Sequence, residues 1–115
     1  MNIEIRNFTK TKINEQLITG LAKKVLKSEN GKIEELSIVI VGERRMRSLN
    51  KKYRKIDRPT DVLSFGDGVN EIFICPEKIK KGEFEKIFLH GLLHVLGYDH
   101  GELMEKKQNK YLKNK

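Results

Sequence analysis

All three histidines of this chain lie in one short segment, HGLLHVLGYDHGE. His90 and His94 are four residues apart, so on a helix both imidazoles project from one face. Gly97 allows the chain to turn back sharply, which brings His100 toward the same point. Neutral imidazole is a good ligand for Zn²⁺, and three protein ligands with one open position are typical of a catalytic zinc site. We therefore predict that His90, His94 and His100 bind one metal ion.

The histidine segment has two alternative interpretations, a structural one and a protease one. A single histidine in a core is more often a satisfied hydrogen-bonding group than a ligand, but three together favour metal binding. The spacing H-x-x-x-H-x-x-G-x-x-H equals that of the metzincin proteases, in which a glutamate after the first histidine is the general base. Gly91 occupies that position here. The sequence therefore disfavours peptide hydrolysis and predicts that a backbone or a substrate approaches the helix at Gly91.

The first half of the chain is predicted to form two strands, each followed by a helix. NIEIR alternates apolar and polar residues, which indicates an edge or half-buried strand. LSIVIV, residues 36–41, is nearly continuously apolar and predicts a central strand. After it, residues 43–54 form a helix with Met46, Leu49 and Tyr53 facing inward. The earlier helix spans 11–28 and ends at ENGK, where Gly31 suits a left-handed turn. Its apolar residues are Ile13, Leu17, Ile18, Leu21, Ala22, Val25 and Leu26.

The second half is predicted to carry a hairpin and two helices. DVLSF and EIFIC are strands joined by the loop GDGVN. Residues 83–96 form a buried helix that contains the first two histidines. Residues 102–112 form a last helix with Leu103, Lys107 and Tyr111 on one side. The predicted fold class is α+β in the order β-α-β-α-β-β-α-α, with a single mixed sheet of about four strands covered by helices and a metzincin-like zinc helix.

The bulk composition is typical of one soluble domain. A length of 115 residues suits a single domain over 1–115. The apolar runs are too short to cross a bilayer, and the start of the chain lacks the layout of a signal peptide. The lone Cys75 cannot form an internal disulfide and is predicted to be a buried apolar residue. We therefore expect a cytoplasmic protein without a membrane partner.

The net charge is +8 and the pI is near 9.6, which favours an anionic partner such as nucleic acid. A lysine-rich surface that only solvates the protein is the alternative. Tyr53 and Tyr98 are candidates for stacking on unpaired bases, although the helical position of Tyr53 favours core packing. The densest basic stretch is 44–58, and contact with RNA phosphates is predicted for Arg44, Arg45, Arg47, Lys55 and Arg58.

Three segments resemble one known family. HGLLHVLGYDH is similar to the signature of the YbeY-type endoribonucleases, the rRNA maturation factors of bacteria. LNKKYRKIDRPTDVLSF (49–65) and EIFICPE (71–77) resemble two further motifs of the same family. The resemblance implies a single-domain, zinc-dependent endoribonuclease specific for single strands, acting in 16S rRNA 3′-end maturation and ribosome quality control.

The resemblance also implies roles for particular residues. His90, His94 and His100 hold one Zn²⁺ per chain, and Arg54 is the basic residue important for activity. The implied partners are single-stranded RNA, the small ribosomal subunit and associated ribosomal proteins or GTPases. The general base is open, because zinc hydroxide or the 2′-hydroxyl of the RNA can attack. Asp99 either orients a ligand imidazole or serves only in a turn.

The sequence also allows two rival functions. A non-catalytic ribosome assembly factor would use the same basic surface, with zinc only securing the fold. A metal hydrolase of another substrate, peptide included, is the other rival, and Gly91 is the feature against it.

Overall fold

Strand β2 (Glu35–Ile40) lies inside the sheet and is buried on both faces. Ile38 and Ile40 belong to one hydrophobic core, whereas Val39, on the opposite face, belongs to a second core. Successive side chains of a strand point to opposite faces, so a strand covered on both sides needs apolar residues at nearly every position. The central strand predicted from LSIVIV is confirmed.

The sheet has four strands in the order β1-β2-β4-β3. β1 (Asn2–Asn7) is parallel to β2 and forms one edge. β4 (Glu71–Ile74) is parallel to β2 on its other side. β3 (Val62–Phe65) is antiparallel to β4 and forms the second edge. The predicted mixed sheet and its hairpin are therefore confirmed.

The computed structural model describes residues 2–30, 33–66 and 68–113. The predicted fold class and element order are confirmed, while the turn expected at Gly31 lies outside the described residues. None of the described helices is long and apolar enough to cross a membrane. The helices are α1 (Glu15–Ser28), α2 (Glu43–Arg54), α3 (Phe84–Val95) and α4 (Glu102–Lys113), with a short 3-10 turn η1 (Pro76–Lys78) after β4.

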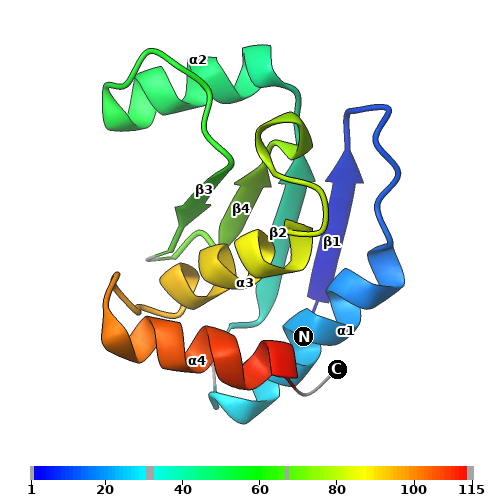
Figure 1. Ribbon diagram of the computed structural model, residues 1–115, viewed down its shortest axis with the longest axis vertical. Helices are drawn as coiled ribbons and strands as arrows, with labels where there is room; N and C mark the ends of the chain where they lie inside the picture. The colour runs from blue at the N-terminus through cyan, green and yellow to red at the C-terminus, as the bar shows by residue number, and fades with distance from the viewer. Residues whose placement is uncertain (1, 31–32, 67, 114–115) are drawn as a thin grey trace.

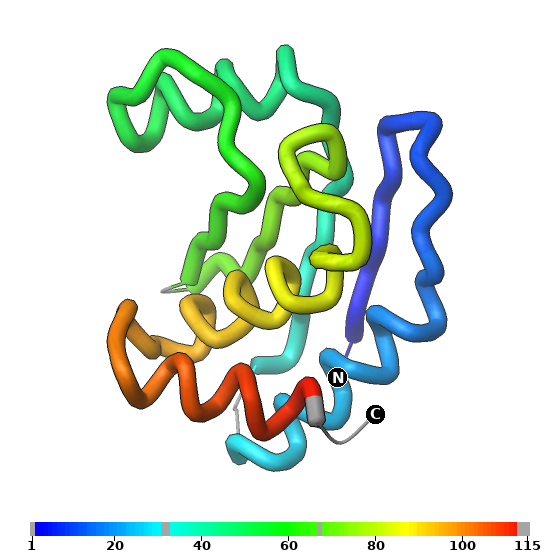
Figure 2. The backbone as a smooth tube through the Cα atoms, viewed as in Figure 1, coloured from blue at the N-terminus to red at the C-terminus, as the bar shows by residue number. Residues whose placement is uncertain are grey.

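Helices cover both faces of the sheet. α1, α3 and α4 contribute to the larger core, with α3 lying directly on the sheet (Figure 1). α2 covers the opposite face, where Met46 packs with Val39 and Phe73. In the tube view, α4 runs beside α3, and the upper ends of β1 and β2 lie together near the start of α2 (Figure 2).

α1 begins later than the sequence predicted. It starts at Glu15 because Asn14 caps it, its side chain accepting a hydrogen bond from the Leu17 amide at 3.1 Å. The expectation of a helix over 11–28 is therefore wrong for its first four residues. Leu17 is also 43% exposed, so it does not belong to the buried face. That face consists of Ile18, Leu21, Ala22, Val25 and Leu26.

The prediction that Tyr53 faces inward is also wrong. Tyr53 is 52% exposed, and Asn50 takes the buried place one turn of α2 beyond Met46. The Asn50 side-chain NH₂ donates to the Arg58 carbonyl at 2.8 Å, which satisfies the buried amide nitrogen and ties the segment after α2 to the helix. On α4, Met104 and Tyr111 are buried, whereas Leu103 is exposed.

α3 packs so closely on β3 that a Cβ at position 91 would overlap side chains of the strand. A Cβ on Gly91 would lie 2.9 Å from Ser64 Oγ and 2.9 Å from a methyl carbon of Val62. Ser64 Oγ also donates to the Gly91 carbonyl at 2.9 Å. The close approach at Gly91 is therefore made by side chains of the sheet and not by the backbone or substrate that the sequence predicted, and a glutamate at this position would have to displace them.

Gly91→Ala is expected to lower the free energy of unfolding by about 1–3 kcal/mol, because overpacking outweighs the better helix propensity of alanine. Gly20→Ala is the matched control, since a Cβ there meets nothing within 4 Å outside its own helix. That control should raise stability by about 0.5–1 kcal/mol. Urea unfolding measures both, and a stabilised Gly91→Ala variant would contradict the packing argument.

Candidate metal centre

The three histidines converge at the end of α3. His90 and His94 lie one turn apart on this helix, and His100 comes from the loop that follows it. Gly97 has φ +101° and Gly101 has φ +148°, so glycines in conformations rare for other residues flank that loop. Ligand atoms of the three side chains all lie within 4.8 Å of one another. The convergence predicted from the spacing is therefore observed.

The donor set fits a metal ion such as Zn²⁺. His94 Nε2 lies 3.1 Å from His90 Nε2. Two nitrogens bound to one tetrahedral Zn²⁺ would be separated by about 3.3 Å. Burial, followed by the neighbouring His90 and His100, lowers the pKa of His94 below its usual value. That shift favours the neutral imidazole, which is the form that binds metal.

α4 supplies a partner that orients one of these rings. His90 Nδ1 lies 3.3 Å from Gln108 Oε1, so a proton on Nδ1 can be donated to the amide oxygen, which would leave Nε2 free to face the other histidines. Gln108 follows His90 by 18 residues. Its role depends on the packing of α4 against α3, and no motif in the sequence predicted it.

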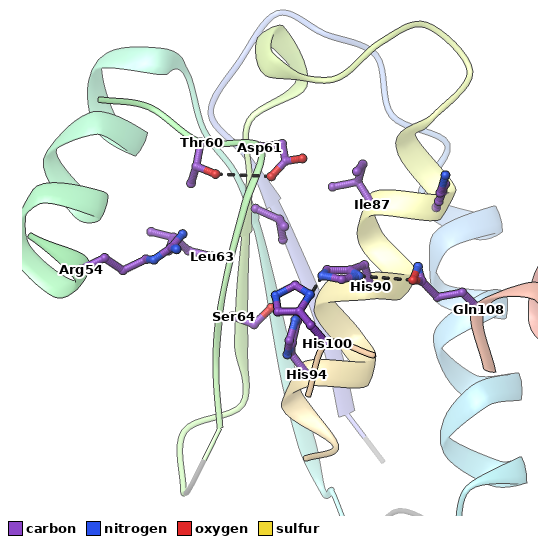
Figure 3. A pocket seen from close by; sticks show the side chains of 12 residues that line it. Arg54, Thr60, Asp61, Leu63, Ser64, Ile87, His90, His94, His100 and Gln108 are labelled. Carbon is purple, nitrogen blue, oxygen red and sulfur yellow. Dashed lines mark hydrogen bonds between the residues drawn. The ribbon is translucent and has the colours of Figure 1, made fainter. Parts of the chain in front are cut away.

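The histidines open onto a cavity of about 720 Å³ between α3 and β3. Arg54, at the end of α2, faces it from the wall opposite the histidines (Figure 3). The cavity thus unites the predicted metal ligands with the predicted basic residue. It has polar and charged lining residues that sequence reasoning did not assign, namely Thr60, Asp61, Ser64, Lys86 and Gln108.

The basic stretch 44–58 divides among different surfaces. Arg47 is paired with Asp57, with Nε 2.8 Å from a carboxylate oxygen, and this contact lowers the pKa of Asp57. Lys55 and Arg58 are exposed and lie outside the lining of the histidine cavity. The remaining two predicted residues, Arg44 and Arg45, line a separate hollow.

Two further residues weighed from the sequence lie outside the cavity. Asp99 is exposed beside His100 and is not part of the lining. Cys75 is buried, as predicted, and burial raises the pKa of its thiol. A thiol held in its protonated form is a poor nucleophile, so Cys75 has a packing role.

Glu29 anchors the loop that carries His100. It caps the end of α1, and its side chain is only 7% exposed. The carboxylate accepts hydrogen bonds from the hydroxyls of Tyr98 and Tyr111 and lies 3.0 Å from Lys107 Nζ. Burial alone would raise the pKa of Glu29, but the bonds from Tyr111, Tyr98 and Lys107 lower it to about 2.

This network joins α1 to α4 and fixes Tyr98 two residues before His100. It also holds the hydroxyl of Tyr98, one of the two tyrosines that the sequence offered as candidates for base stacking. Sequence reasoning missed Glu29, since its tyrosine partners are 69 and 82 residues away and no local pattern marks it.

Comparison with known proteins gives a consistent family. The model of one family, described as endoribonuclease YbeY, matches residues 2–115. The chain is 43% identical over 104 residues to endoribonuclease YbeY of Petrotoga mobilis, covering 76% of this chain and 72% of that protein. It is 33% identical over 123 residues to the protein of the same name from Thermotoga maritima, covering 81% and 82%.

A solved structure has the same fold. A solution structure of a Thermotoga maritima protein superposes with a TM-score of 0.65 and 32% sequence identity. The match covers 96% of this chain and 86% of that one.

His94→Ala is expected to abolish stoichiometric Zn²⁺ binding, because two imidazoles cannot replace a three-ligand site. Gln108→Ala should weaken binding by about 10–100-fold without abolishing it, since it only orients His90. Gln16→Ala, an exposed glutamine on α1, is the control and should bind as the wild type does. Equilibrium dialysis of tag-free protein with metal analysis measures all three. Full occupancy in His94→Ala would refute the assignment.

Glu29→Gln is expected to lower the free energy of unfolding at neutral pH by about 1–3 kcal/mol. The folded pKa of about 2 lies below the ordinary 4.5, so the stabilisation from the ionised carboxylate is complete above pH 4.5 and is lost as the pH falls toward 2. Urea unfolding across that range should show the two proteins converging in acid. Glu34→Gln, an exposed control, should match the wild type throughout. A gap independent of pH would contradict the charge argument.

Proposed function

The chain belongs to the YbeY endoribonuclease family, and we propose that it is a single-domain, Zn²⁺-dependent endoribonuclease that cleaves single-stranded RNA. The observation that carries this proposal is the shared cavity, in which three convergent imidazoles face Arg54. A cation site and a guanidinium on opposite walls are suited to a phosphodiester, which carries negative charge throughout its cleavage.

His90, His94 and His100 would hold the Zn²⁺. Three imidazoles without a carboxylate or thiolate suit a borderline-soft ion, and they leave its full positive charge uncompensated. When bound there, Zn²⁺ supplies a Lewis acid that polarises a phosphoryl oxygen and lowers the pKa of water.

Three other side chains of the cavity would bind phosphate or accept a proton. Arg54 would bind the non-bridging oxygens of the scissile phosphate, since its planar fork matches two of them. Lys86 would contact a neighbouring phosphate. Asp61 supplies a carboxylate on the same wall as β3 (Figure 3), able to accept the proton of the attacking hydroxyl.

Single-stranded substrate fits the dimensions of this cavity. A volume of about 720 Å³ is of the size that takes a small ligand, and RNA is generally read through unpaired bases that can be splayed out. Peptide substrates are disfavoured, because Gly91 leaves no room for the protease glutamate.

The cellular role proposed is maturation of the 16S rRNA 3′ end and ribosome quality control in the cytoplasm, with the small subunit and its associated proteins or GTPases as partners. The net charge of +8 supports an rRNA substrate through phosphate contacts. Family membership supports the same role.

The decisive experiment is cleavage of labelled single-stranded RNA by zinc-loaded protein, with a duplex of the same sequence as the comparison. Arg54→Ala is expected to slow cleavage by about 10²–10³-fold while Zn²⁺ stays bound, because it removes stabilisation of the transition-state charge. Arg6→Ala, an exposed arginine of β1, should leave the rate unchanged.

His94→Ala purified in parallel excludes a contaminating nuclease. Zinc-loaded wild type that binds RNA without cutting it would establish the non-catalytic assembly factor instead. Cleavage at the wild-type rate in Arg54→Ala would remove this residue from the mechanism.

A further inference from the structure

A second hollow of about 650 Å³ lies on the far side of α2 from the histidine cavity. We propose that it binds an unpaired nucleotide of the RNA, away from the bond that is cut. This inference rests on the proposed function for the identity of its ligand. The lining consists of Phe8, Val41, Gly42, Arg44, Arg45, Ser48, Leu49 and Lys52.

The hollow lies at a topological switch point of the sheet. Phe8 directly follows β1, and its amide donates to the Ile40 carbonyl at 2.9 Å, so it lies beside the end of β2. The helix after β1 packs on one face of the sheet, whereas the helix after β2 packs on the other. Parallel strands whose connections diverge in this way leave a crevice at their carboxyl ends, where ligands of open α/β sheets bind.

The lining combines an aromatic wall with cations. Phe8 is 66% exposed, so its ring is accessible to a ligand in the hollow. Val41 is buried and Leu49 half-buried, so the floor is apolar. An aromatic platform over an apolar floor accepts the flat face of any base, and nearby cations accept its phosphate.

Two of those cations, Arg44 and Arg45, are available to a ligand. Within the part of the chain that the structure describes, neither Arg44 nor Arg45 forms an ion pair. Arg47, by contrast, is already paired with Asp57. Guanidinium groups bind phosphate oxygens in a bidentate manner, so charge complementarity favours an RNA phosphate over an apolar partner.

Helix α2 separates this hollow from the histidine cavity and also connects them. Arg54 is two residues beyond Lys52, which places it about 200° around the helix. Arg45 and Arg54 are about 14 Å apart along the helix axis. Exposed Lys51 lies between the two faces, so one extended strand can cross the solvent side of α2 and occupy both sites.

The test is fluorescence anisotropy with a labelled single-stranded oligouridine of about twelve nucleotides, long enough to span both sites. Zinc-loaded protein is titrated in the cold, and a gel confirms that the RNA stays intact. Phe8→Ala and Arg45→Glu should each raise the Kd at least about fivefold. The matched controls are Val69→Ala, another exposed apolar residue, and Lys23→Glu, another exposed cation; each should change the Kd less than about twofold.

Cleavage separates this inference from the proposed nuclease activity. A dinucleotide that reaches only the histidine cavity should be cut at the wild-type rate by Phe8→Ala. If the zinc-loaded wild type cuts no RNA but both variants still bind RNA more weakly, the nucleotide pocket is supported and the proposed nuclease activity is refuted. Wild-type affinity in Phe8→Ala and Arg45→Glu, with cleavage intact, would overturn the pocket alone. Displacement of the RNA by polyglutamate as readily as by unlabelled oligouridine would also overturn it, in favour of an acidic peptide.

Discussion

The close contact between α3 and β3 at Gly91 is the constraint on which the site depends. Because position 91 has no side chain, Ser64 can donate to the Gly91 carbonyl and the strand can lie directly against the helix. The same contact places the β3 wall opposite His90 and His94, so the cavity has the histidines on one side and β3 residues on the other. A larger residue at this position would widen the separation between those two sides and also disturb the core beneath them.

A second constraint acts through a buried carboxylate. The first two histidines are fixed by the helix that carries them, but His100 comes from a loop and is itself exposed. Glu29 fixes that loop through Tyr98, and it fixes α4 through Tyr111 and Lys107. α4 in turn presents Gln108 to His90. A side chain distant from the metal centre thus connects the elements that orient it, and its own ionisation is stabilised by the same contacts.

Helix α2 places its arginines on different surfaces of the molecule. Its buried side, with Met46 and Asn50, holds the helix on the sheet and the following turn on the helix. Its two flanks lead to different hollows, with Arg54 on one and Arg44 and Arg45 on the other. A basic stretch that is continuous in sequence is therefore divided by helical geometry into separate surfaces.

The sequence by itself determined the fold class, the element order and the convergence of the histidines. These features follow from local periodicity and spacing, which the backbone geometry of helices and strands translates directly into direction. Only the tertiary structure decided that Glu29 and Gln108 support the site, that Tyr53 is exposed, and that Arg44 and Arg54 face different hollows. Such features depend on which elements pack together, and contacts between residues tens of positions apart leave no periodic signal in the chain.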